Sequence, residues 1–250
     1  MSTRAALLLG CLLLLGCKPV VPAAPVVTDA AALVARTRAE AAAAPTYASF
    51  SALLRLPDQS VSLQGTLVVS APDRFRVELR GPIGPAQVIV TCNGTDATAW
   101  LAPKNSFRVL PDANRALGTL LGGAEGLGGA AVATSLLLGR LPELPGVPEL
   151  RAAGSVATAT WARPDGASFE AAIESRTGHL VSARALDAGG QLLLDAAWEP
   201  GPLPASMRVS LPTLGVVADV RFSSWNPAAP ADSLFEGVAP DGAVVSPLEL

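Results

Sequence analysis

The chain has 250 residues, of which 50% are hydrophobic, 16% charged and 4% aromatic. This length suits one large domain or two small ones. Its 22 Pro and 23 Gly are too many for a typical helix bundle but too few to indicate collagen or a chain without a core. The 18 basic and 21 acidic residues give a net charge of -3 without a basic run, so nucleic acid is not an expected partner.

Side chains suited to catalysis or metal binding are scarce, with one His, one Tyr and three Cys in the chain. From the sequence alone, no Ser and Asp can be assigned to His179 as partners in a catalytic triad. No Gly-x-Ser-x-Gly motif occurs either. The remaining Cys and carboxylates show no metal-ligand spacing. The Gly-rich residues 122–129 lack the Lys-Ser/Thr of a phosphate loop. We therefore expect no catalytic residue, no metal and no cofactor, and we do not expect an enzyme.

The N-terminus resembles a bacterial lipoprotein signal. Arg4 precedes an apolar run that ends in Leu14-Leu15-Gly16-Cys17. The run is shorter than the roughly 20 residues that span a bilayer, and it lies where a cleaved targeting segment lies. The resemblance implies that residues 1–16 are a signal peptide and that Cys17 is acylated with chains such as palmitate.

Two alternatives to this lipidation site stay open. The stretch Leu8-Leu9-Gly10-Cys11 has the same local pattern, but cleavage there would leave an apolar segment below the expected length of about 7–15 residues. An ordinary secretory signal with an incidental Cys17 is the second alternative.

Acylation of Cys17 would anchor the chain at a membrane without spanning it. Lys18 follows Cys17, whereas Asp at this place marks inner-membrane retention in the enterobacterial sorting rule. The resemblance therefore implies a lipid anchor in the outer membrane and a chain that faces the periplasm. Residues 17–27 are rich in Pro and predict an extended tether, and residues 28–250 are expected to form one domain.

A helix and a series of strands are predicted next. Residues 28–44 predict a helix with Thr28 as N-cap, ending before Pro45. From Tyr47 onward the hydrophobic period changes to two, most clearly over residues 74–80. Clusters of Gly, Pro, Asn and Asp separate these runs at hairpin spacing, which indicates an antiparallel meander.

The middle of the chain predicts two short helices, over residues 111–121 with Asp112 as cap and over residues 130–141. Strands resume at residues 155–162, 168–175, 180–187, 191–198, 206–211 and 217–225, for about eleven in all. So many antiparallel strands must curl or close. We expect a mostly β fold with some α, in which a half-open barrel is covered by helices and encloses an apolar space.

The order of these elements resembles the LolA and LolB family of lipoprotein carriers. The resemblance rests on the lipoprotein signal, the N-terminal helix, residues 50–65 and 72–79, and the turn Gly81-Pro82-Ile83-Gly84. It covers about residues 28–225 and implies a half-open barrel with a helical lid that shelters acyl chains. In LolB the apolar residue of this turn helps to deliver cargo to the membrane, and Ile83 is the matching residue. The alternative is that Ile83 packs against its own hairpin.

The family also uses an arginine to hold its lid, but this residue cannot be assigned here. Arg74, Arg76 and Arg80 alternate with apolar residues and predict a solvent-facing row. Cys92, the cysteine left after processing at Cys17, is expected to be a packed apolar residue without a disulfide partner.

Taken with the resemblance, these observations predict a lipoprotein of the outer membrane that binds acyl chains of lipids or lipoproteins. It would serve as a carrier or receptor in cell-envelope biogenesis. The alternative function is a structural or assembly lipoprotein that holds an envelope protein at a sheet edge.

Overall fold

A computed structural model describes residues 29–41, 47–81, 84–115, 129–227 and 229–247. Its helices are α2 (Ala30–Ala41) and α4 (Ala130–Leu137). The strands are β1 (Tyr47–Arg55), β2 (Ser60–Ser70), β3 (Arg74–Arg80), β4 (Val88–Asn93), β5 (Ala97–Leu101), β6 (Ser106–Leu110), β7 (Glu149–Ala153), β8 (Val156–Ala162), β9 (Ser168–Glu174), β10 (Leu180–Leu186), β11 (Leu192–Trp198), β12 (Ser206–Leu211), β13 (Val216–Asn226) and β14 (Val244–Pro247). Short 3-10 turns are η1 (Ala102–Lys104), η2 (Pro212–Leu214) and η3 (Asp232–Phe235).

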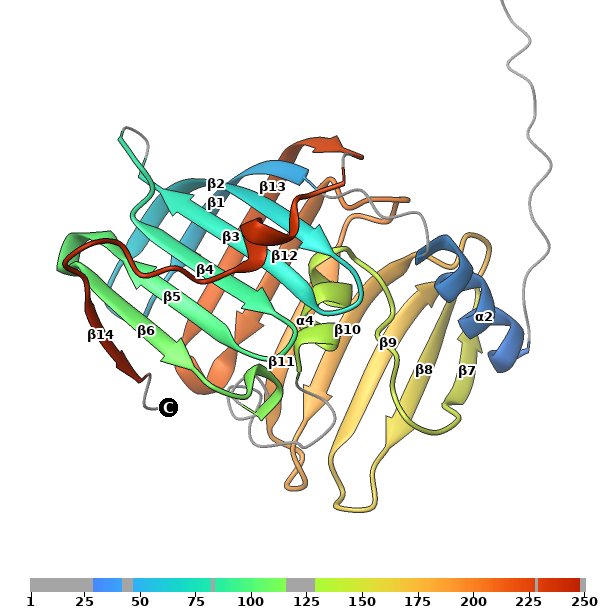
Figure 1. The fold of residues 1–250 in the computed structure, drawn as a ribbon. Coiled ribbons are helices and arrows are strands. Elements are labelled where there is room, and N and C mark those ends of the chain that lie inside the picture. Colours follow the sequence, from blue (N-terminus) through green and yellow to red (C-terminus); the bar gives the residue numbers. More distant parts are fainter. Residues whose placement is uncertain (1–28, 42–46, 82–83, 116–128, 228, 248–250) are drawn as a thin grey trace, which may run out of the picture.

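The described strands form one sheet in the order β14-β6-β5-β4-β3-β2-β1-β13-β12-β11-β10-β9-β8-β7. Neighbouring strands are antiparallel except β14 and β6, which are parallel. The pairing of β1 with β13 joins the two halves of the chain, from Tyr47↔Asn226 to Arg55↔Val217. The sheet curls without closing, so its two edge strands, β14 and β7, stay apart (Figure 1).

This architecture confirms the expected curled antiparallel sheet, but the number of strands was underestimated. The described residues form 14 strands, whereas the pattern predicted about eleven. The strands that were missed are β6, β7 and β14, which have 5, 5 and 4 residues. Such short segments show little alternation, and β14 pairs with a strand far away in the sequence, which no hairpin signal predicts.

Helices α2 and α4 pack on the concave side of the sheet (Figure 1). In α2, Leu33 and Val34 are buried, and Arg36 donates a hydrogen bond of 2.7 Å from Nη1 to the carbonyl of Arg176 between β9 and β10. Helix α4 lies inside the curl, where Trp198 of β11 donates from Nε1 to the carbonyl of Leu136 at 3.1 Å. The predicted helix over residues 130–141 is shorter than expected, because Gly139 at φ 63° provides a left-handed C-terminal end.

The cap predicted at Asp112 is present. Its Oδ1 accepts a hydrogen bond of 3.1 Å from the backbone N–H of Arg115, at the start of the helix predicted over residues 111–121. Residues 116–128 lie outside the described residues, together with most of the Gly-rich stretch. Asn114 accepts a bond of 3.0 Å from the N–H of Ala130, so this helix start also caps α4.

The chain after β13 covers the outer face of the sheet. Phe235 in η3 is 2% exposed and packs under the guanidinium of Arg74, which lies 5.1 Å from the ring centre. Arg74 also pairs with Asp232 at 2.6 Å, and Arg76 donates to the carbonyl of Leu234 at 3.4 Å. The arginine row of β3 therefore faces outward as expected, but two of its members hold the C-terminal segment.

Within the part of the chain described here, no helix is long and apolar enough to cross a membrane.

Candidate functional site

The inner wall of the curl is buried at one end and open at the other. Side chains alternate across a strand, so Phe50, Leu67, Phe75 and Cys92 identify the inner face, where each is at most 9% exposed. Along the same face, toward the hairpins β1–β2, β3–β4, β5–β6 and β12–β13, the apolar residues become only half-buried. They are Leu54, Val61, Leu63, Val77, Leu79, Val88, Val90, Ala99, Leu101, Val209, Leu211, Val216 and Ala218.

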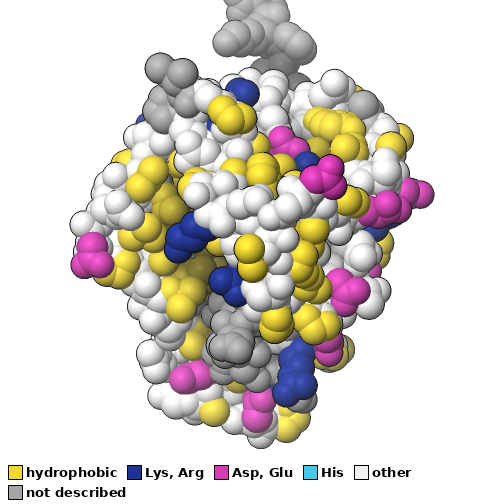
Figure 2. Space-filling model, turned by 60° about the vertical axis from the view of Figure 1, so that its left-hand side comes forward, with side chains coloured by type: hydrophobic (Ala, Val, Ile, Leu, Met, Phe, Trp, Pro, Cys, Tyr) yellow, Lys and Arg dark blue, Asp and Glu magenta, His cyan; other side chains and the backbone are white. Residues whose placement is uncertain are grey.

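We call this partly buried inner wall the trough. Figure 2 shows a hollow in this part of the molecule, lined by hydrophobic side chains and bordered by Lys or Arg side chains. The strand register places the trough residues beside one another, as in Leu79↔Val88 and Val88↔Leu101. The trough is thus a continuous apolar surface on seven neighbouring strands, β5-β4-β3-β2-β1-β13-β12.

The other half of the sheet offers no comparable surface. On β8 and β9 the inner residues Ala157, Ala159, Phe169, Ala171 and Ile173 are at most 1% exposed. Helix α2 lies beside these strands and supplies cover (Figure 1). Helix α4 contacts β3 and accepts the hydrogen bond from Trp198 of β11, so it borders the trough at its buried end.

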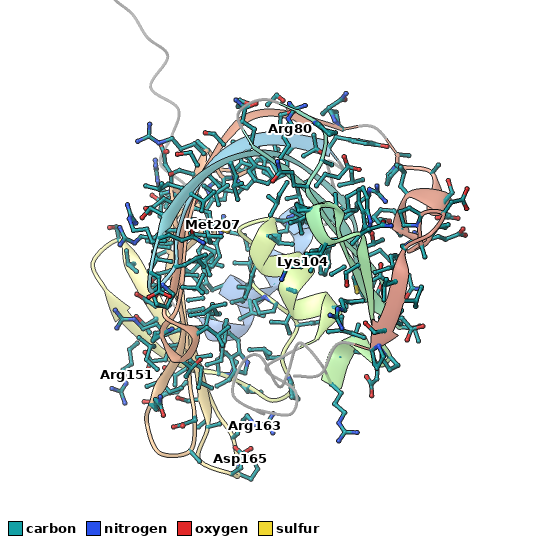
Figure 3. The ribbon with its side chains drawn as sticks, turned by 90° about the vertical axis from the view of Figure 1, so that its left-hand side faces the viewer. Arg80, Lys104, Arg151, Arg163, Asp165 and Met207 are labelled. Atoms are coloured by element: carbon teal, nitrogen blue, oxygen red, sulfur yellow. The ribbon has the colours of Figure 1, made fainter. Side chains whose placement is uncertain are left out.

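Four hairpin connections border the mouth of the trough. The tip of β12–β13 carries Leu214, whose side chain is 46% exposed, beside Gly215 at φ 65°. The tip of β5–β6 carries Lys104, which lies within the outline of the curled sheet in the view along its axis (Figure 3). The β3–β4 connection contains Ile83, which lies outside the described residues, as does Cys17.

Three polar residues, Ser106, Arg108 and Ser246, lie on the otherwise apolar inner wall near the β14 edge. Arg108 of β6 is opposite Ala99 of β5 and alternates with Ser106 and Leu110, which are both buried. Its Nη1 donates a hydrogen bond of 2.6 Å to Oγ of Ser246 in β14. The inward position of Arg108 could not be predicted from the sequence, because the apolar pair of this strand is Phe107 and Val109. They face outward, where the C-terminal segment lies.

A separate cleft of about 920 Å³ crosses β2, β1, β13, β12 and β11. Its charged residues alternate with core residues such as Val220, so they belong to the outer face of the sheet. Asp219 pairs there with Arg55 and, at 3.6 Å, with Arg208. These charged side chains distinguish the lining of this cleft from the apolar trough.

Chemically reactive groups do not gather in the trough. Cys92 is fully buried with its thiol 3.6 Å from the carbonyl of Asp73, and burial raises the pKa of this thiol. It is a packed residue, as predicted, and within the described residues it has no disulfide partner. The described residues contain no group of three or more His, Cys, Asp and Glu placed to hold a metal ion.

No protein-family model matches the sequence, and no curated protein matches it. Solved structures do match the fold. A LolA superfamily protein from Nitrosomonas europaea aligns with a TM-score of 0.55 and 10% identity, covering 84% of this chain and 98% of that one. The fold is LolA-like. This resemblance was expected from the order of the elements, and it concerns the fold alone at such low identity.

Two further structures share the LolA-like fold. A DUF1329 family protein from Desulfovibrio piger has a TM-score of 0.56 at 10% identity over 82% of this chain and 95% of that one. A domain from Vibrio parahaemolyticus, named for outer membrane lipoprotein sorting, has a TM-score of 0.54 at 10% identity over 82% and 97%. Proteins with this fold thus include one whose name refers to lipoprotein sorting.

Proposed function

We propose that the chain is a lipid-anchored envelope protein that binds acyl chains of lipids or lipoproteins in the trough, as a carrier or receptor. The observation that carries this proposal is the continuous apolar inner wall that is only partly buried near one end of the LolA-like curl. Exposed apolar patches of this kind in soluble domains mark binding sites. No catalytic step is part of the proposal.

The driving force would be burial of apolar surface, worth about 25 cal/mol per Å². An acyl chain laid against Leu79, Val88 and Leu101 would cover the part of these side chains that the fold itself leaves in water. Because this force lacks direction, affinity should depend on chain length more strongly than on the detailed shape of the chain.

The N-terminus and the open end of the trough have roles in this proposed function. Residues 1–16 would be removed as a signal peptide, Cys17 would carry the lipid anchor in the outer membrane, and residues 17–27 would tether the single domain of residues 28–250. Ile83, in the connection between β3 and β4, would contact the membrane when cargo is delivered. Support comes from the signal-like sequence and from the position of this connection at the mouth.

Two neighbouring leucines allow a matched test of the trough. Leu54 faces the inner wall and Leu53 the outer face of β1, and both are half-buried. Residues 18–250 would be produced with a non-lipoprotein signal, so that the protein carries no lipid anchor and can be purified without detergent. This protein would be titrated with a fluorescent palmitate analogue. Leu54→Gln should weaken binding roughly 5- to 30-fold, from a loss of about 1–2 kcal/mol of apolar contact. Leu53→Gln should bind within twofold of wild type.

Equal binding by the two variants, or no binding by the wild-type chain, would contradict the proposed function. Thermal unfolding of each variant provides the control, since a folded Leu54→Gln protein is needed for the comparison.

A second candidate function is favoured by β7, an edge strand of the sheet that the described residues form. This strand ends the sheet, and its Glu149 and Arg151 are exposed and paired at 3.0 Å. A protein partner could add an extended strand there. Photocrosslinking from position 151 in the cell envelope should then give one defined adduct that is absent from position 184 of β10. Identical adducts from both positions would count against this function.

A further inference from the structure

Arg108 is a half-buried cation on the inner wall, beside the trough. The register places it opposite Ala99 of β5 and Ser246 of β14, and Ala99 in turn lies opposite Val90 of β4. The guanidinium group therefore lies on the β14 side of an apolar surface. A bound acyl chain would remove water from it, and burial of a charge is costly unless the charge is paired.

The partners of this guanidinium are neutral. Nη1 donates to Oγ of Ser246 at 2.6 Å and to the carbonyl of Pro247 at 3.5 Å. Since a guanidinium has five N–H donors, further donors remain for a ligand. No carboxylate among the described residues forms an ion pair with Arg108.

Most other arginines in the described parts of the chain differ in this respect, whereas Arg80 and Arg221, which also form no ion pair with a described carboxylate, are exposed on the outer face. Ion pairs with Asp or Glu are formed by Arg55, Arg74, Arg76, Arg151, Arg163, Arg176, Arg184 and Arg208. Arg108, which faces the inner wall, lacks such a partner. Lys104, at the tip of the same hairpin and exposed, also forms no ion pair with a described carboxylate.

We propose that the preferred ligand of the trough is an anionic amphiphile whose carboxylate or phosphate is held by Arg108. This inference rests on the proposed function and names its ligand class. The acyl chain would lie on Ala99, Val90 and the neighbouring apolar residues of β3 and β4, while the head group would accept hydrogen bonds from the guanidinium. Charge-assisted bonds of this type are the stronger ones, and a planar guanidinium matches both head groups. Lys104 would add attraction at the mouth.

The test compares dodecanoate with dodecanol at pH 8, by displacement of a neutral fluorescent probe from residues 18–250. The two ligands share one chain and differ in charge. The wild-type protein should bind dodecanoate at least tenfold more tightly. Arg108→Gln should lose about tenfold in dodecanoate affinity and stay within twofold for dodecanol. Arg108→Lys should keep part of the preference, because it keeps the charge.

Arg221→Gln is the matched control, because Arg221 is exposed on the outer face of β13 and should leave both affinities unchanged. Inorganic phosphate at millimolar concentration should not displace the probe, which separates a lipid head group from a free anion. Equal affinity of the wild-type protein for the two ligands would overturn the inference while leaving the proposed function intact. Failure of both ligands to bind would instead remove the proposed function. The wild-type comparison decides the matter even if Arg108→Gln does not fold.

Discussion

Shortening the ligand is the perturbation whose effect follows most directly from the half-open trough. A fully buried CH2 group contributes about 0.8 kcal/mol. The trough is open, because its residues are only partly buried by the fold. An acyl chain lying on it would keep one side toward solvent, so each CH2 group of the ligand should contribute about half of the 0.8 kcal/mol. Removing four CH2 groups should then cost about 1.6 kcal/mol, which is roughly a 15-fold loss of affinity.

The assay is calorimetric titration of residues 18–250 with saturated carboxylates of 16, 12 and 8 carbons. The affinity should fall by a similar factor at each step, and the heat-capacity change of binding should become less negative as the chain shortens. A roughly 200-fold loss at each step would show that the chain is fully enclosed, contrary to the half-open geometry. Affinities that do not change with chain length would refute the reasoning, because the apolar wall would then contribute nothing.

Three further predictions concern the scaffold. Phe235→Ala should lower the free energy of unfolding by about 3–5 kcal/mol, measured by urea denaturation, and a loss below about 1 kcal/mol would show that the C-terminal segment does not cap the sheet. Cys92 should react with a thiol reagent at pH 8 only after denaturant is added, because it is buried and its pKa is raised by burial; labelling of the native protein at the rate of a free thiol would contradict this. Gly65→Ala should lower the midpoint of thermal unfolding, because a Cβ there would overlap the Phe50 ring and the carbonyl of Glu78; an unchanged midpoint would mean that the ring moves aside without cost.

The central and C-terminal strands were well predicted because their signals are local. Strand β12 has the predicted bounds, Ser206–Leu211, β8 to β11 differ from prediction by one residue at one end, and β13 differs by one residue at each end. Each lies between clear turn residues and alternates regularly, as in the buried positions of β9. The three strands that were missed are short and lie at or beside a sheet edge, where pairing with distant chain segments decides the structure.

The candidate site could be predicted only in outline. An apolar interior follows from the strand count and from strands that are apolar on both faces. The partial exposure of Leu79, Val88 and Leu101 does not follow from the sequence, because it depends on where the helices lie on the inner face. The inward position of Arg108 could not be predicted either. Its neighbours Phe107 and Val109 are apolar and would be expected to face inward, but they face outward, where the C-terminal segment covers them.

The central claim, that the trough holds an acyl chain, is tested most directly by native mass spectrometry of residues 18–250 purified from the periplasm without detergent. We predict an added mass that extraction identifies as an acyl-chain lipid or acylated peptide, near one copy for each protein chain. A protein that carries no added mass, and that also fails to take up a fluorescent fatty acid, would contradict the claim and direct attention to the edge strand β7.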